Sequence, residues 1–371
     1  MRFIWRGTTS RYLFLIKDQK KVVDFFPELC YNASNCVRAN APFLFFMKPN
    51  FVHFYQIPFT GLGLHGGYRG DQWLRNRIRI FNNFVLPSLI AQGSRDFYVW
   101  FCWRPEEKEN PIVKEFKRTL DKVEDFLHVH TFGGVLFWDD KYDDKTASER
   151  LLRGLEISLP ELKDYVGDLP YVLVTLQPSD DMYLSSAAKA IKGKFATLLE
   201  NDPQNTRRVV GWKKGYIMNL ETKEIAEYLG TNDRTPEMIR NYPDTMPPFF
   251  TILFSNEEFM NPKKHYDYLG PYRSHEYIEK HFEYSELEGR EFIVGCHGEN
   301  ISTIYNHPFK GRTLSKEETE DVLIKTGLFS AEPIELKKLP RVKIREFINK
   351  LPFLSLLKRI YGKLPPRYKI I

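Results

Sequence analysis

Two neighbouring carboxylates, Asp180 and Asp181, are the residues of this chain best suited to do chemistry. They follow a run of apolar and β-branched residues, Tyr171 to Leu176, that predicts a strand buried on both faces. Open α/β sheets bind ligands beyond the carboxyl ends of their strands, where this pair would lie. A hard divalent cation prefers oxygen ligands of this kind and often bridges a diphosphate. Alternatively, Ser179 or Asp180 caps a helix predicted over residues 182–199, and its dipole favours Asp181.

A histidine at the end of a second strand could join the two carboxylates. The run Phe292 to Cys296 predicts a strand, and His297 follows it directly. An imidazole in this place could complete a Mn²⁺ or Mg²⁺ site built otherwise from carboxylates. The alternative is a histidine that bonds to the backbone of a turn.

A glycine-rich loop, Gly61 to Gly70, contains the G-x-G-x-x-G spacing of a dinucleotide fingerprint. That fingerprint needs its third glycine to open a helix and an acid about 20 residues later. Here the helix begins at Asp71, and the second strand ends in Cys102-Trp103-Arg104-Pro105. The spacing therefore argues against a nicotinamide or flavin site. Two alternatives remain for this loop: a flexible loop beside a nucleotide or sugar site, or a plain turn.

Two other charged groups are less specific. The segment WDDKYDD, with four aspartates from 139 to 144, lacks the glycine and distal glutamate of a calcium loop, so a solvated loop is expected. Arg75, Arg77 and Arg79 crowd one helix near the glycine loop, where one of them could reach a diphosphate. The sequence has no G-x-S-x-G, Walker or zinc signature.

Strands and helices alternate over residues 51–200, which predicts an α/β fold with a mostly parallel sheet flanked by helices. The expected strands are 51–59, 96–103, 129–138 and 171–176, and the expected helices are 71–86, 112–127, 147–162 and 182–199. Further strands are expected at 207–219, 249–254 and 292–296. We expect one elaborated domain over residues 51–310, preceded by an extension (1–50) and followed by a connecting segment (311–336) and a tail (337–371).

The charge is placed unevenly along the 371 residues, whose net charge is +6. Residues 337–371 hold eleven Lys or Arg and one acid, Glu346, a net charge of +10, which leaves −4 for residues 1–336. An enzyme acting on nucleic acid would carry basic charge across its main surface, so no nucleic-acid partner is expected. No run is apolar enough for a signal peptide or a membrane span, which predicts a cytoplasmic protein.

The tail has the pattern of two short amphipathic helices, 342–350 and 353–361, with lysines and arginines beside each apolar stripe. Basic amphipathic helices commonly lie on anionic membranes. We therefore expect residues 337–371 to bind the inner face of the membrane peripherally. The alternative is a helix pair docked on the body of the protein itself.

Several segments of residues 51–310 together resemble the bacterial rhamnosyltransferase-like glycosyltransferases, which have a GT-A-like nucleotide-sugar fold. The segments are HFYQIPFT, WLRNRIRIFNNFVLPSLIAQ, DFYVWFCW, LVTLQPSDDMY, GYIMNLETKEI, PPFFTILF and CHGENIST. The family pattern L-D-x-D-D has an acid ahead of the aspartate pair, whereas this chain has Gln177-Pro178 there.

The resemblance implies transfer of a sugar from a nucleotide-diphosphate-sugar donor to a hydroxyl of a glycan or lipid-linked acceptor. It implies that Asp180 and Asp181 hold Mn²⁺ or Mg²⁺ on the diphosphate, with His297 as a further ligand. It also implies donor contacts at Thr60 and Arg77. One alternative is a non-catalytic carbohydrate- or nucleotide-binding protein on the same fold, which the missing acid at Pro178 favours. Another is a nucleotidyltransferase, which would release pyrophosphate.

Overall fold

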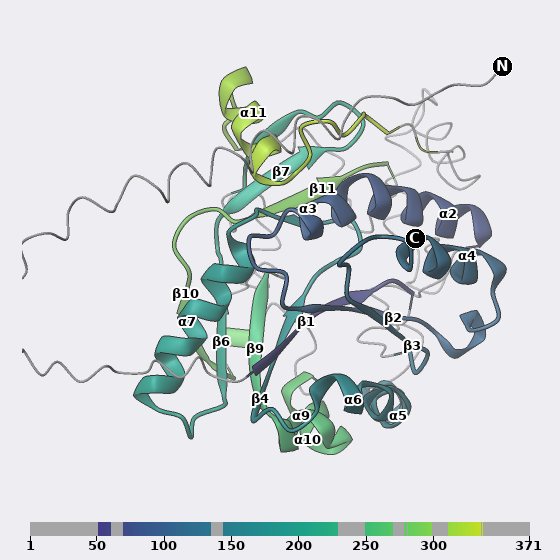
Figure 1. The fold of residues 1–371 in the computed structure, drawn as a ribbon, viewed down its shortest axis with the longest axis vertical. Coiled ribbons are helices and arrows are strands. Elements are labelled where there is room, and N and C mark those ends of the chain that lie inside the picture. The colour runs from purple at the N-terminus through teal and green to yellow at the C-terminus, as the bar shows by residue number, and fades with distance from the viewer. Residues whose placement is uncertain are drawn as a thin grey trace, which may run out of the picture. The chain divides into compact units, whose positions relative to one another are not determined.

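A computed structural model of the 371-residue chain describes residues 51–60, 70–134, 144–228, 249–269, 278–279, 281–298, 311–334 and 336. The expected extension (1–50), the glycine-rich loop, the aspartates of WDDKYDD before Asp144 and the basic tail lie outside these ranges. Figure 1 shows the described elements as a sheet between layers of helices, with a second, smaller sheet beside it.

The large sheet has seven strands in the order β10-β6-β9-β4-β1-β2-β3. Six of them are mutually parallel, and β9 is antiparallel to both of its neighbours, β4 and β6. The strands are β1 (Phe51–Pro58), β2 (Tyr98–Cys102), β3 (His128–Thr131), β4 (Tyr171–Leu176), β6 (Arg208–Gly211), β9 (Phe250–Ser255) and β10 (Glu283–Glu286). This mostly parallel sheet flanked by helices is the α/β class that the sequence predicts, and it is consistent with a GT-A-like fold.

The strand order reverses next to Asp180 and Asp181. The chain runs outward from β1 to β2 and β3, then returns to the other side of β1 to form β4. Such a reversal leaves a crevice at the carboxyl ends of the two central strands, the usual ligand site of open α/β sheets. The carboxyl ends of β1 and β4 meet there.

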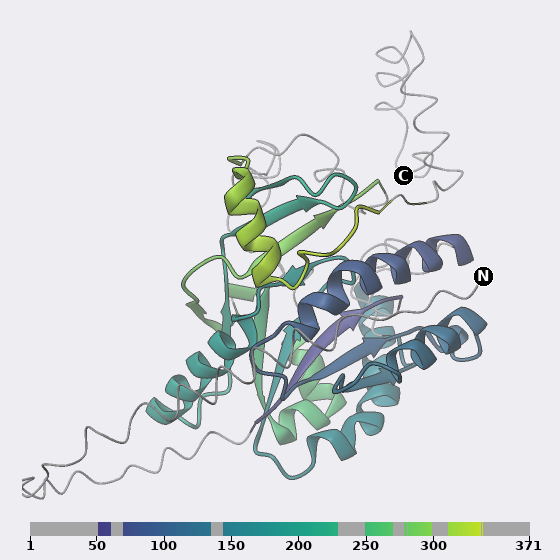
Figure 2. The ribbon, with the colours of Figure 1, turned by 45° about the horizontal axis from the view of Figure 1, so that its top comes forward.

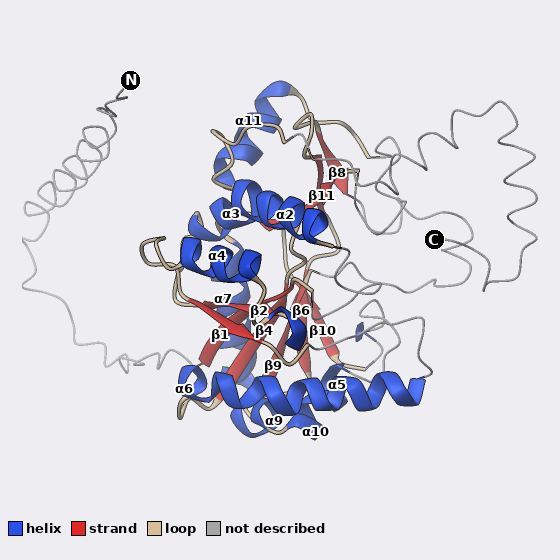
Figure 3. Cartoon of the chain, turned by 90° about the vertical axis from the view of Figure 1, so that its right-hand side faces the viewer, coloured by secondary structure: helices blue, strands red, loops and turns tan. Residues whose placement is uncertain are grey.

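Helices cover both faces of the large sheet, as Figure 3 shows edge-on. Alternating side chains of β1 divide between two apolar cores: Tyr55 and Ile57 face one, and Val52 and Phe54 face the other. The first core lies under α2 (Asp71–Ile80), α3 (Leu86–Ile90), α4 (Pro111–Leu120) and α7 (Ala187–Asn201). The second lies under α5 (Asp144–Ser158), α6 (Lys163–Val166), α9 (Asn256–Met260) and α10 (Pro262–Leu269).

The smaller sheet has the order β5-β11-β7-β8 and shares the first core. Its strands are β5 (Met182–Tyr183), β7 (Gly215–Asn219), β8 (Ile225–Tyr228) and β11 (Phe292–Cys296), and α11 (Lys316–Lys325) lies beside it (Figure 2). The expected connecting segment packs here, since Leu328 and Ile334 are buried. Gly327 lies so close to Ala91 and Pro87 of the α3 region that a Cβ would collide with both.

The helix that begins at Asp71 runs further than the sequence predicts, because a π turn over Phe81–Val85 lies just before Pro87. The Leu86 amide donates to the Phe81 carbonyl five residues earlier. Proline cannot donate to the preceding turn and crowds the carbonyl four residues back. The π turn, which is wider than an α-helical turn, accommodates the proline at this point, and the helix continues to Ile90.

Other expected elements also differ from the structure. The helix expected over 112–127 ends at Leu120, and Asp125 beyond it has a φ of 56°, a left-handed conformation that a helix cannot contain. The helix expected over 147–162 becomes a 3-10 turn at Leu159, next to Pro160. The strand expected over 207–219 is two strands, β6 and β7, which belong to different sheets. Strand β4 and strand β11 have the predicted bounds.

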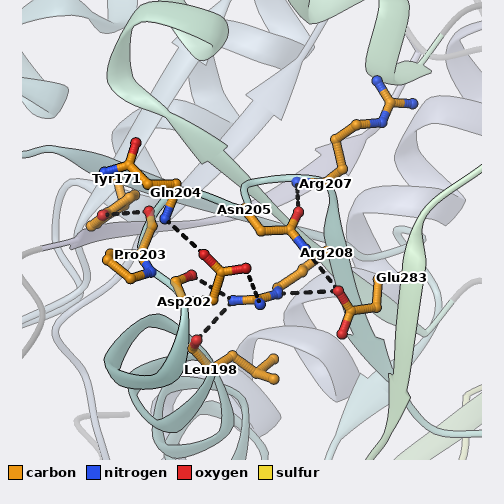
Figure 4. A network of polar contacts seen from close by, with 9 residues as sticks. All are labelled: Tyr171, Leu198, Asp202, Pro203, Gln204, Asn205, Arg207, Arg208 and Glu283. Carbon is orange, nitrogen blue, oxygen red and sulfur yellow. Dashed lines mark hydrogen bonds and ion pairs between the residues drawn. The ribbon is translucent and has the colours of Figure 1, made fainter.

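A buried arginine joins α7 to two strands of the large sheet (Figure 4). Arg208 Nη1 donates to the carbonyl oxygens of Leu198 (2.7 Å) and Asp202 (2.9 Å) at the end of α7. Its other nitrogens pair with the Asp202 carboxylate at 3.3 Å and with Glu283 of β10 at 3.4 Å. A cation here complements the negative end of the helix dipole.

Replacing Arg208 by Met should lower the free energy of unfolding by about 3 kcal/mol, because two carbonyls and two acids lose their partner. Urea unfolding followed by circular dichroism measures this. Arg118→Met is the matched control, since the Arg118–Glu115 pair is exposed on both sides (69% and 62%) and should change stability by less than about 0.5 kcal/mol. Equal losses in the two variants would contradict a structural role for the Arg208 network.

A buried histidine should make the fold sensitive to acid. His265 lies against the rings of Phe254 and Phe259, and its Nδ1 donates to the Phe259 carbonyl at 2.9 Å. Burial lowers its pKa to about 4, which outweighs the opposite effect of that hydrogen bond. Between pH 6.5 and about 4 the unfolded chain therefore binds a proton at this residue that the folded chain does not, so stability falls as the pH falls.

Between pH 7 and pH 4.5, the free energy of unfolding of the native chain should fall by about 2 kcal/mol more than that of His265→Phe. His53 and His130 are also buried with lowered pKa values and act in the same direction in both proteins, so only the difference reports on His265. Denaturant unfolding at the two pH values measures it. Parallel pH profiles would show that His265 does not contribute.

No helix within the described ranges combines the length and apolar character needed to cross a membrane.

Candidate functional site

Asp180 and Asp181 lie in the loop that leaves the carboxyl end of β4. The capping alternative for them is wrong, because the next helix, α7, begins at Ala187 and its N-cap is Ser186. Between the aspartates and this helix the chain forms the short strand β5, which pairs with β11. That pairing joins residues more than 100 positions apart, so the local pattern of residues 182–199 predicts only the helix.

Three residues predicted as site residues come together around one carboxylate oxygen. The Arg77 Nη1 atom lies 2.5 Å from Asp180 Oδ2, and the His297 Nε2 atom donates to the same oxygen at 3.1 Å. The three side chains are 5%, 13% and 0% exposed, respectively, so Asp180 is the most accessible of them. Arg77 also stacks over the Trp73 ring, with 5.5 Å from Cζ to the ring centroid.

Asp181 has a different partner, which lies on β11. Its Oδ1 accepts a hydrogen bond from the backbone amide of Gly295 at 2.9 Å. Gly295 also packs against the backbone of Asp180, where a Cβ would overlap the carbonyl oxygen. A glycine is therefore required at this close approach, and the end of β11 fixes both aspartates at once.

The surroundings of the two aspartates shift their pKa values in opposite directions. Burial alone would raise the pKa of Asp180, but the Arg77 charge and the His297 hydrogen bond outweigh it and hold that pKa well below its usual range. Burial and the Asp180 charge raise the pKa of Asp181 well above its usual range, against the Gly295 hydrogen bond. Burial lowers the pKa of His297, opposed by Asp180. The arrangement thus presents an ionised Asp180 beside a neutral imidazole.

Thr60, the other predicted donor contact, lies at the end of β1 and is buried. Its hydroxyl donates to the carboxylate of Glu107, and the Arg104 amide donates to the hydroxyl oxygen at 3.4 Å. These contacts lie beyond the end of β2 and do not join Thr60 to the Asp180 group. Burial raises the pKa of Glu107, partly offset by Thr60.

Gln92 supports the loop of the site, and the sequence analysis did not single it out as a site residue. Its Nε2 donates to the carbonyls of Ser88 (3.1 Å) and Leu184 (2.8 Å), and its Oε1 accepts from the Ala188 amide at 3.0 Å. The side chain therefore fixes the chain between β5 and α7, directly after Asp181. The only sequence signal was the LPSL-x-x-Q segment within the family resemblance.

The side chains predicted to hold Mn²⁺ or Mg²⁺ have partners within the protein. Among the described residues, no group of three or more His, Cys, Asp or Glu is arranged to hold a metal ion. Arg77 already lies on Asp180 Oδ2, and Asp181 Oδ1 is engaged by Gly295. In this arrangement Asp180, Asp181 and His297 do not fit a resident cation. The divalent cation at these side chains stays a prediction.

Of the other predicted groups, Arg75 and Arg79 are exposed on α2, on the side away from the core. The glycine-rich loop from Gly61 to Arg69, residues Asp139 to Asp143 and residues 299–310 lie outside the described ranges.

Comparisons with known proteins find similar solved structures. No family model matches the chain, and no curated protein matches it. Among solved structures, S. aureus TarS 1–349 is similar, with 12% identity over 80% of this chain and 78% of that chain and a TM-score of 0.33. The apo form of mouse xyloside xylosyltransferase 1 is similar with 11% identity over 61% of this chain and 71% of that chain and a TM-score of 0.26. At these TM-scores, function has to be argued from the fold and site of this chain.

Proposed function

We propose that the chain is a glycosyltransferase that moves a sugar from a nucleotide-diphosphate-sugar donor to a hydroxyl of a glycan or lipid-linked acceptor. One observation carries the proposal: the buried Arg77–Asp180–His297 group lies beyond the carboxyl end of β4, at the point where the strand order reverses and open α/β sheets bind ligands. Buried charges whose ionisation is strongly shifted by a specific charge partner are candidates for a functional site.

The chemistry of this group suits a diphosphate leaving group. A guanidinium binds phosphate oxygens through parallel N–H donors and stays charged at every physiological pH. Asp180 and the Trp73 ring orient Arg77, so little reorganisation is needed when the glycosidic bond breaks and charge develops on the diphosphate. His297 fixes the other side of Asp180.

The finer assignments rest on the resemblance and the charge pattern of the sequence. A rhamnosyl donor follows from the family resemblance. Association with an anionic membrane follows from the basic residues of the tail (337–371), and would bring the site close to lipid-linked acceptors.

A non-catalytic carbohydrate- or nucleotide-binding protein is the second candidate. The observation that favours it is Pro178, which stands where the related pattern has an acid ahead of the pair, with Gln177 before it. The Gln177 side chain is buried and donates to the Asp181 carbonyl at 3.0 Å, so it supports the loop rather than adding a charge.

A two-part experiment separates these candidates. A thermal-shift panel of nucleoside diphosphates and their sugars, each with and without Mn²⁺, should give at least one ligand that raises the melting temperature by mass action. Hydrolysis of that nucleotide sugar should then release nucleoside diphosphate. Binding without hydrolysis or transfer to any acceptor favours the non-catalytic protein, and release of pyrophosphate indicates a nucleotidyltransferase. A panel with no stabilising ligand would contradict both nucleotide-dependent functions.

A further inference from the structure

We infer that the guanidinium of Arg77, held in place by Asp180, is the cation of this site, so that the chain binds the diphosphate of its donor without a divalent metal. The inference rests on the proposed function and specifies which group of the protein neutralises the negative charge of the diphosphate. It departs from the Mn²⁺ or Mg²⁺ that the sequence predicts.

The position of Arg77 is the first reason. Its Nη1 atom lies 2.5 Å from Asp180 Oδ2, the same oxygen to which His297 Nε2 donates. A metal bound through this oxygen would lie about 2 Å from it and would therefore compete with the guanidinium for the same place. Two positive charges so close together repel strongly when both are shielded from water.

The second reason is that the chain builds a support for Arg77. The side chain is 5% exposed, and its charge lies over the Trp73 ring one turn earlier on α2. His297 donates to the carboxylate oxygen that holds Arg77 and so limits how Asp180 can rotate. By contrast, Arg75 on the same helix is exposed.

The third reason is the orientation of Asp181. A metal held by a neighbouring aspartate pair needs oxygens of both residues pointing to one place. Asp181 Oδ1 instead accepts from the Gly295 amide, and the Gly295 backbone lies against the Asp180 carbonyl. Strand β11 therefore keeps the two carboxylates on separate partners.

The Arg77 guanidinium carries more N–H groups than its ion pair with Asp180 uses among the described residues. It carries five N–H groups in a planar fork, and the ion pair with Asp180 is made through Nη1. Two parallel N–H groups along one edge of this plane match two phosphate oxygens. The ligand class that this geometry suits is a nucleoside diphosphate, free or carrying a sugar.

The test uses the full chain stripped of metal with EDTA, and UDP, GDP and dTDP as probes in calorimetric titrations. We expect at least one probe to bind in EDTA with a Kd within about 3-fold of its value in Mn²⁺. Arg77→Met should weaken that binding by at least about 10-fold, the loss expected for a charge-assisted hydrogen bond. Arg75→Met, on the same helix and exposed, should bind as the native chain does.

A direct measurement on the native chain covers the case in which Arg77→Met does not fold. Electron paramagnetic resonance of Mn²⁺ mixed with the protein alone should keep the spectrum and intensity of the free ion. Loss of free Mn²⁺ signal, together with probe binding that requires Mn²⁺, would overturn the inference and leave the proposed function standing. If no probe binds with or without Mn²⁺, the proposed function fails as well, so the two failures are distinct.

Discussion

Asp180→Asn should lower nucleotide-sugar turnover by about 10²–10³-fold, the loss typical of removing one preorganised electrostatic group from an active site. Asn has nearly the same shape but no charge. Arg77 would lose the partner that orients it, and His297 Nε2 would lose a charged acceptor. Release of nucleoside diphosphate from the donor found in the thermal-shift panel measures the effect. Asp164→Asn, an exposed acid on α6, is the control and should leave turnover unchanged.

The same substitution leaves Arg77 buried without its carboxylate, which should destabilise the fold by about 3–5 kcal/mol. A second variant separates this loss from the loss of turnover. Asp180→Asn combined with Arg77→Met removes both charges, so it should recover much of the stability and none of the turnover. Normal turnover in either variant would contradict the assignment of this site.

Gly295→Ala should reduce turnover by at least about 100-fold and also lower stability, although it adds only one methyl group. The new Cβ would overlap the Asp180 carbonyl oxygen and lie 3.1 Å from its carbon, so the backbone of one strand end must move. That movement breaks the hydrogen bond from the Gly295 amide to Asp181. Overpacking of a buried site by one carbon commonly costs about 1–3 kcal/mol. Turnover and thermal unfolding of the purified variant measure the two effects.

Gly193→Ala is the matched control for this prediction. Gly193 lies inside α7, and a Cβ there would meet nothing within 4 Å. The substitution should leave turnover unchanged and raise stability by about 0.5–1 kcal/mol, because alanine loses less conformational freedom in a helix. A Gly295→Ala protein as active as the Gly193→Ala protein would show that the contact between β11 and Asp180 does not matter for turnover.

The parts of the fold that the sequence predicted well are those with a strong local pattern. Strands Tyr171–Leu176 and Phe292–Cys296 have the predicted bounds because their apolar runs are short and end in polar residues or glycine. The helix expected from Met182 was wrong over its first residues, because Met182 and Tyr183 pair with β11. A partner so distant in sequence leaves no local signal.

The candidate site likewise has residues that local patterns predicted and residues whose roles depend on long-range contacts. Asp180 and His297 were predicted from their places at strand ends, and the structure brings them within 3.1 Å. The family resemblance singled out Arg77 among three similar arginines, and in the folded chain Arg77 is buried whereas Arg75 and Arg79 are exposed. The roles of Gly295 and Gln92 depend on approaches between distant backbones, which residue types and spacing do not report.

The pairing of β5 with β11 also decides when the site can form during protein synthesis. The hydrogen bond between Asp181 and Gly295 spans 114 positions, and the one between Asp180 and His297 spans 117. At ribosomal rates of about 5–20 residues per second, roughly 6–23 s pass between the synthesis of the aspartates and that of their partners. During that interval a nascent chain would expose the edges that β9 and β11 later cover, so chaperone demand should peak before residue 297 leaves the ribosome.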